Sequence, residues 1–155
     1  MIETVAELVA HHPLFAGLEP SAVELVADCA VNAVFDAGRL LIAEGDDADT
    51  LYLMRRGTVT IELHDPGRPQ RVVERVGPGA VVGWSWLFPP YRWRFDVRAD
   101  GPVGAIAVDA ACLRAKAEAQ PAFGYHLALR LGGAMLERLD GGRIRLLDLY
   151  GEDVP

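Results

Sequence analysis

The sequence predicts a mainly β fold with flanking helices, an antiparallel sandwich or barrel with a jelly roll among the candidates. Three observations lead to this class. Apolar residues follow helical spacing near both ends, short runs rich in β-forming residues fill the middle, and clusters of Gly, Pro and Asp separate these runs. A chain of 155 residues, 51% hydrophobic and 24% charged, is long enough to bury one core.

Two short helices are expected before the β region. The first is amphipathic, lies within residues 1–11 and ends before Pro13, because the residue preceding a proline is disfavoured in helical geometry. The second begins at Pro20, a residue suited to the first turn of a helix, and carries an apolar stripe to Cys29.

From Val31 the apolar period changes, and strands alternate with turns. The expected strands are Val31–Phe35, Leu40–Ala43, Leu51–Met54, Thr58–Leu63, Arg71–Val76, Arg94–Val97 and Val103–Val108. The expected turns are 36–38, 45–47, 56–57, 65–67, 77–79, 89–90 and 100–102.

Helical spacing returns at Asp109, a suitable N-cap for a helix over Ala110–Ala119. A longer helix starts at Ala122. Its glycine pairs, 132–133 and 141–142, predict a kink or a close helix contact, because glycine costs about 1 kcal/mol relative to alanine inside a helix. The expected organisation is a single domain over 1–155, with N-terminal helices at 1–30, a β-roll at 31–108 and C-terminal helices at 109–150.

The charge, the cysteines and the absence of long apolar segments limit the possible classes of protein. The net charge of −7 argues against a surface for nucleic acid, which requires a basic face. Cys29 and Cys112 belong to no CxxC motif, so we expect both to be reduced and buried. No membrane span or signal segment is visible, so a cytoplasmic location without membrane contact is expected.

The stretch from Val76 to Asp100 is the candidate site. It holds half of the twelve aromatic residues, with glycines before them and arginines after them. Glycine turns beside arginines favour an anion site, and aromatic side chains favour a flat or apolar partner. Because Arg92, Arg94 and Arg98 alternate along an expected strand, we expect them to share one face. The candidate ligand-binding residues are Gly83, Trp84, Ser85, Trp86, Arg92, Trp93 and Arg94.

Two glycine-anchored motifs resemble the cyclic nucleotide-binding domain, the sensor of catabolite-activator-type regulators, cyclic-nucleotide-dependent kinases and gated channels. Gly45-Asp46, Asp49, Leu51-Tyr52-Leu53, Gly57, Val59 and Ile61 resemble its first hairpin, and Gly79-Ala80-Val81-Val82-Gly83 resembles the entry to its phosphate-binding cassette, here residues 83–99. The resemblance covers about residues 13–139. It implies an antiparallel β-roll or jelly roll of about eight strands with a C-terminal helical segment, and a non-enzymatic sensor without a cofactor or metal.

The cassette departs from that family at two positions. The family usually has a ribose-binding glutamate after the second glycine, where this chain has Trp84, whose indole N–H only donates. It usually has a phosphate-binding arginine four residues before Val97, where this chain has Trp93. Each lost charged hydrogen bond costs about 1.5–3 kcal/mol, which predicts weak binding of cyclic AMP or GMP in the usual pose. Arg92 or Arg94 replaces the arginine if the cassette backbone slips by one residue.

The leading interpretation is a non-enzymatic regulatory module whose cassette binds a small ligand or a protein partner. The alternatives are a genuine cyclic nucleotide regulator using Arg92 or Arg94, a cassette filled by its own tryptophans, and a cupin-like enzyme. The last requires clustered metal ligands, and the four histidines are scattered in sequence.

The C-terminal helix carries a second expectation, a homodimer. Its counterpart in the resembling regulators pairs across a two-fold axis. The expected seam is Leu131, Met135, Leu139, Ile144 and Leu147. The sequence ends at Pro155, sixteen residues after Leu139, so we expect a stand-alone sensor that does not bind DNA through a helix-turn-helix.

Overall fold

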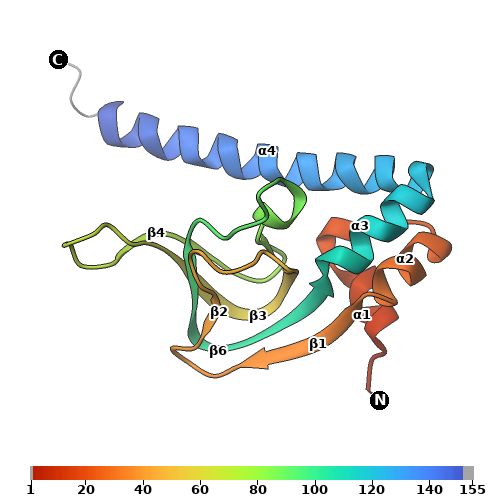
Figure 1. Ribbon diagram of the computed structural model, residues 1–155. Helices are drawn as coiled ribbons and strands as arrows, with labels where there is room; N and C mark the ends of the chain where they lie inside the picture. The colour runs from red at the N-terminus through yellow and green to blue at the C-terminus, as the bar shows by residue number, and fades with distance from the viewer. Residues whose placement is uncertain (1, 152–155) are drawn as a thin grey trace.

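The computed structural model describes residues 2–151 and places helices around an antiparallel sheet of six strands (Figure 1). The elements in chain order are α1 (Val5–His11), the 3-10 turn η1 (Pro13–Phe15), α2 (Pro20–Ala27), β1 (Ala30–Phe35), β2 (Leu40–Ile42), β3 (Thr50–Leu63), β4 (Arg71–Val76), β5 (Val81–Val82), the 3-10 turn η2 (Ser85–Leu87), β6 (Asp96–Asp109), α3 (Ala110–Ala119) and α4 (Pro121–Gly151). Within residues 2–151, no helix combines the length and the apolarity needed to cross a membrane.

Strands β3 and β6 form the centre of the sheet, which runs in the order β1-β6-β3-β4. The short strands pair with these two as well, β2 with β6 and β5 with β3. Leu51, Leu53 and Ile106 are fully buried between the sheet and the helices. The predicted mainly β fold with flanking helices is therefore confirmed.

The sheet has six strands where about eight were expected. Two pairs of the seven strands predicted by position are continuous, as β3 and β6, and the short strand β5 was not predicted. The predicted turn at Gly57 bends β3 without ending it, and the turn at residues 100–102 does the same in β6. Gly57 has φ +79°, and a Cβ there would lie 2.3 Å from the Pro102 carbonyl oxygen. The bend therefore requires a residue without a side chain, and it lets one long ladder curve into a roll.

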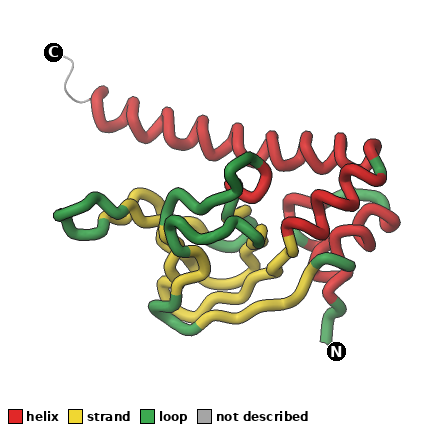
Figure 2. Tube along the Cα trace, viewed as in Figure 1, coloured by secondary structure: helices red, strands yellow, loops and turns green. Residues whose placement is uncertain are grey.

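Helix α4 runs continuously along one side of the molecule, while α1, α2 and α3 gather at one end (Figure 2). The kink expected at the glycine pairs is wrong, since α4 is one continuous helix. Among the described residues of this chain, no other element makes a close contact there, because a Cβ at Gly132, Gly133 or Gly141 would have no atom within 4 Å. Tertiary contacts of the two residues just before the first glycine pair hold the helix against the rest of the molecule. Leu131 is buried in the core, and Arg130 donates hydrogen bonds to the carbonyls of Leu14 and Ala16.

Cys29 and Cys112 form a disulfide, which corrects the expectation that both are reduced. Cys29 lies between α2 and β1, and Cys112 lies in the first turn of α3, where the Asp109 side chain caps the helix as predicted. Their sequence separation of 83 residues hid the pairing, because only the fold brings their Cα atoms to 5.6 Å. In the chain-entropy description, closing a loop of this length stabilises the fold by about 4–5 kcal/mol.

His12 is a buried histidine between α1 and η1. Its Nδ1 accepts a hydrogen bond from the Leu14 backbone N–H at 3.2 Å, so the neutral ring carries its proton on Nε2. Burial lowers the pKa of His12 below the ordinary value of 6.5, and the nearby backbone carbonyls of Met54 and Ala80 only partly oppose this shift.

The lowered pKa of His12 predicts that the protein becomes less stable in acid. Below pH 6.5 the unfolded chain binds the proton more tightly than the folded one, so the free energy of unfolding should fall as the pH decreases through this range. We expect His12→Asn to flatten this dependence, because the amide oxygen can accept the Leu14 N–H and does not titrate. Urea unfolding between pH 8 and pH 5 measures how the free energy of unfolding changes with pH. The same change with pH in the parent protein and in His12→Asn would contradict the assignment to His12.

Candidate functional site

The cassette loop, residues 83–95, connects β5 to β6 and is tied to the turn before β3. The Trp93 N–H donates to the Asp46 carbonyl at 3.0 Å, and the Gly45 N–H donates to the Trp93 carbonyl at 2.9 Å. The Ala48 N–H donates to the Tyr91 carbonyl at 2.8 Å. These bonds join the two glycine-anchored motifs that the sequence singled out, so the loop is held at its middle as well as at its ends.

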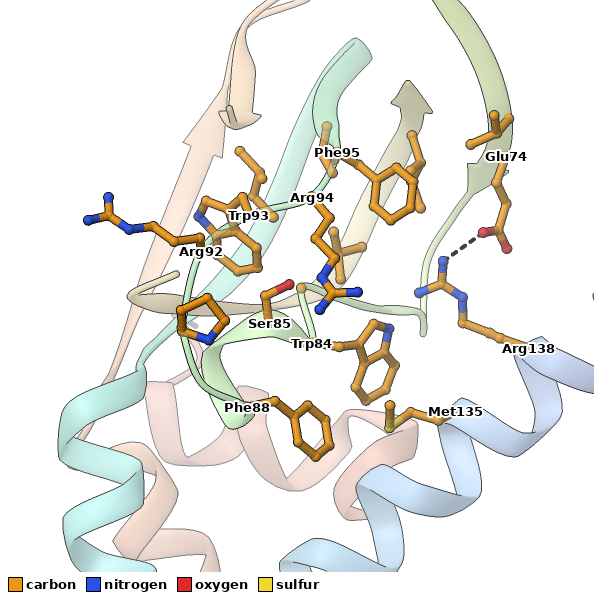
Figure 3. Close-up of a pocket in the computed structure, with 17 residues that line it drawn as sticks. Glu74, Trp84, Ser85, Phe88, Arg92, Trp93, Arg94, Phe95, Met135 and Arg138 are labelled. Atoms are coloured by element: carbon orange, nitrogen blue, oxygen red, sulfur yellow. Dashed lines mark hydrogen bonds and ion pairs between the residues drawn. The ribbon is translucent and has the colours of Figure 1, made fainter. Parts of the chain in front are cut away.

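A cavity of about 380 Å³ lies between the cassette loop, the sheet and α4 (Figure 3). Its size is that of a pocket for a small organic molecule. Most of the lining is apolar: Ile42, Ile61, Val73, Val82, Gly83, Trp84, Phe88, Pro90, Trp93, Phe95, Val97 and Met135. The polar lining is Glu74, Ser85, Arg92, Arg94 and Arg138.

Trp93 packs into the inner wall of the cavity and is only 7% exposed. Its ring lies against Gly83, where a Cβ would come within 2.7 Å of the ring edge. Gly83 also has φ +95°, so the position requires glycine for both space and backbone geometry. One tryptophan therefore fills part of the cassette, as the self-filling alternative expected, but an open cavity remains beside it.

Arg94 and Arg92 point in different directions. Arg94 extends into the cavity beside Trp84 and Ser85 (Figure 3). Arg92 extends outward and forms an ion pair with Asp47 at 2.8 Å. Among the described residues, Arg94 has no hydrogen-bond or ion-pair partner, so its charge is available to a bound anion.

The expectation that Arg92, Arg94 and Arg98 share one face is wrong. Strand β6 begins only at Asp96, so the two-residue alternation of a strand does not apply to residues 92–95. Arg98 lies within β6 and pairs with Glu62 of β3 at 3.2 Å. Each of the three arginines therefore has a different environment.

Trp86 is the candidate residue that the structure places away from the cavity. Trp84 and Ser85 line the cavity, but Trp86 is buried in the core side of η2 and is only 1% exposed. Its backbone carbonyl accepts a hydrogen bond from the Arg114 guanidinium of α3. The η2 turn explains the difference, since successive side chains of a 3-10 turn diverge by about 120°.

Several elements outside the cassette complete the cavity, and two of them, α4 and β4, add polar lining residues that were not predicted. Helix α4 contributes Met135 and Arg138, and β4 contributes Glu74. Arg138 bonds Glu74 at 2.7 Å and donates to the Val81 carbonyl at 2.9 Å, which joins α4 to both β4 and β5. Because Arg138 neutralises Glu74, the unpaired charge facing the cavity is that of Arg94. Met135 stood in the predicted apolar stripe, but no sequence signal paired Arg138 with Glu74.

Gly83→Ala should damage the cavity wall. A Cβ would meet the Trp93 ring at 2.7 Å in addition to straining a backbone of φ +95°. We expect a loss of about 2–4 kcal/mol in the free energy of unfolding. Gly101→Ala is the matched control, because Gly101 has φ +91° and open space around it, so that only about 1–2 kcal/mol of backbone strain applies. Equal losses by urea unfolding would contradict the packing of Trp93 on Gly83.

The chain belongs to the cyclic nucleotide-binding domain family, whose sequence model matches residues 33–120. The β-roll, the cassette between β5 and β6 and the C-terminal helix over it agree with this family.

Similar proteins include regulators. A CRP-like cAMP-activated global transcriptional regulator from Mycobacterium tuberculosis is 28% identical over 149 residues, which are 96% of this chain and 65% of that protein's length. A putative cyclic nucleotide-binding protein from Geobacter metallireducens is 29% identical with a TM-score of 0.77, over 90% of this chain and 99% of that chain. The regulatory subunit of a cAMP-independent protein kinase A from Trypanosoma brucei shares the fold, at 21% identity and a TM-score of 0.62 over 81% of this chain and 50% of that chain.

Proposed function

We propose that this chain is a non-enzymatic regulatory module that binds a small organic anion with a flat apolar body in the cassette cavity. The observation that carries the proposal is the Arg94 side chain, which points into an open aromatic cavity without a partner among the described residues. Arg94 is exposed, so its guanidinium is free to form a charge-assisted hydrogen bond with an anion that enters the cavity.

The lining favours the shape of this ligand. Trp84 and Phe88 offer aromatic surface beside Arg94, and Val73 and Met135 close the cavity from β4 and α4. Aromatic and aliphatic walls bind a flat apolar body through burial of its surface, and one cation fixes its acidic end. An aromatic carboxylate has both parts.

A cyclic nucleotide is the second candidate, and Arg94 is the observation that favours it. The mycobacterial relative is named as cAMP-activated, and Arg94 here can supply a cation for the phosphate. Two features oppose tight binding. Trp84 offers no acceptor for a ribose hydroxyl, and Glu74 is already paired with Arg138. Arg92 does not fit the role, because it pairs with Asp47 on the outside.

The contacts of α4 with the cavity suggest how a bound ligand would change the structure of the module. Met135 and Arg138 belong to this helix and line the cavity, so an occupant contacts α4 directly. A ligand that fits one position of the helix better than another shifts the population toward it. The module then transmits occupancy through the orientation of α4.

Ligand binding is tested by calorimetry and melting temperature with cyclic AMP, cyclic GMP, indole-3-acetate and 2-naphthoate. We expect the aromatic carboxylates to bind more tightly, and Arg94→Met to weaken them about 10- to 100-fold, the value of one charged hydrogen bond. Arg92→Met is the matched control and should change the affinity little, because the Arg92 guanidinium points away from the cavity and pairs with Asp47.

The outcomes separate the candidates. Micromolar binding of a cyclic nucleotide that depends on Arg94 would favour the second candidate. No shift in melting temperature with any of the four compounds at millimolar concentration, or equal losses in the two arginine variants, would contradict a ligand site at Arg94.

We also propose that α4 pairs with α4 of a second copy. The predicted seam needs revision, because Leu131 is buried in this chain's own core and Met135 lines the cavity. The face opposite these residues carries Leu129, Leu136 and Leu147, all exposed and at helical spacing. Gly132 and Gly133 lie along the same face with open space around them, which permits close approach of a second helix.

Leu136→Glu should shift the protein toward monomer, because it places a charge in the middle of this face. Leu149→Glu is the matched control: Leu149 is 71% exposed, compared with 56% for Leu136, and lies on the opposite side of the same helix. Sedimentation velocity over a range of concentrations measures the effect. A monomeric parent protein, or equal effects of both substitutions, would contradict the proposed face.

A further inference from the structure

We infer that the Cys29–Cys112 pair is a reversible thiol redox site that controls, through α3, how firmly the cassette loop is held. The inference concerns regulation of the proposed ligand site, and only its effect on ligand affinity rests on the proposed function. The mechanical link between the cysteines and the loop stands on contacts of α3 alone.

One face of α3 is attached to the corner between α2 and β1. Cys112 is bonded to Cys29 there, and Lys116, one turn later, lies 3.2 Å from the Asp28 carboxylate. The disulfide is the covalent member of this attachment. The ion pair beside it is solvent-exposed on the Asp28 side and is therefore weak by itself.

The other face of α3 holds the cassette loop through Arg114. Its guanidinium donates a hydrogen bond to the Trp86 carbonyl in η2. The same group stacks over the Tyr91 ring, 4.6 Å from the ring centroid. Arg114 thus contacts the loop at two points, and both depend on where α3 lies.

The exposure of the two cysteine residues indicates which of them a reductant attacks. Cys29 is buried, whereas Cys112 is half-buried, so a thiolate from a dithiol reductant attacks the Cys112 sulfur. The S–S bond breaks, and Cys29 leaves as a thiolate that takes up a proton. The second thiol of the reductant then attacks the mixed disulfide and releases Cys112. Two electrons and two protons pass to the pair, and the reductant becomes a cyclic disulfide.

Loss of the bond removes the covalent link between α3 and the corner, and leaves the ion pair, side-chain packing and the hydrogen bond from the Asp109 N–H to the Cys29 carbonyl. The helix gains freedom to move relative to α2, and Arg114 moves with it, so the hydrogen bond to Trp86 and the stack on Tyr91 loosen. Since η2 and the following loop form one wall of the cavity, reduction opens that wall.

Hydrogen exchange of the ligand-free protein tests the link. The amides of Leu87, Phe88 and Tyr91 are hydrogen-bonded within the loop and report its opening. We expect them to exchange about tenfold faster after reduction with a phosphine and in the C29S/C112S variant. A tenfold change corresponds to the free energy of about one lost charged hydrogen bond. Unchanged exchange in the reduced protein would overturn the inference.

Three variants distinguish the link from a general loss of stability. In oxidised Arg114→Met the loop should already exchange about tenfold faster, with no further increase on reduction. Lys116→Met, on the same helix but without a loop contact, should retain the redox response. Val59→Ala, a cavity variant in the centre of β3, should destabilise the oxidised protein without selective opening of the loop.

If Val59→Ala opens the loop as much as reduction does, or if Arg114→Met retains the full redox response, the inference is wrong. If the double cysteine variant does not fold, the oxidised Arg114→Met and reductant-treated wild-type proteins still decide between the outcomes. Because the readout needs no ligand, it is independent of whether an anion binds at Arg94.

Discussion

The pairing of β3 with β6 is the constraint on which the rest of the structure depends. Both ends of the cassette are fixed by it: β5 enters the cassette paired to β3 at Tyr52 and Leu53, and β6 leaves it with Asp96 opposite Glu62 of β3. The bend at Gly57 curves this ladder, so the loop between its ends closes over one side of the sheet. The cavity exists because a 13-residue connection must span two points on the same central strand.

Within this frame, the site combines apolar walls with one unpaired charge. Trp93 fills the inner wall and removes room that an arginine side chain would use, whereas the next charged residue, Arg94, faces the remaining space. Of the other charged lining residues, Glu74 pairs with Arg138 and lies 3.9 Å from Arg145, and Arg92 pairs with Asp47. In the ligand site that we propose, selectivity would depend on apolar burial plus a single charge, and a ligand with several polar groups would leave some of them without partners.

The sequence predicted much of the cassette and little of its surroundings. Gly83, Trp84 and Ser85 line the cavity as expected, because the glycine-anchored motif fixes the local path of the chain. Whether they bind a ligand stays a prediction. Trp86 was misplaced because the 3-10 turn at Ser85–Leu87, which the sequence did not predict, directs this side chain into the core. The walls from β4 and α4 were missed, since contacts between residues about sixty positions apart leave no periodic signal.

The sequence by itself determined the class of fold, the order of its elements, the N-cap at Asp109 and the family, because periodicity, capping and turn residues act over a few positions. Only the tertiary structure decided the disulfide between Cys29 and Cys112, the continuity of α4 across its glycines and the opposite directions of Arg92 and Arg94. Each depends on which distant surfaces meet. Local propensity is a weak preference that such packing readily overrides.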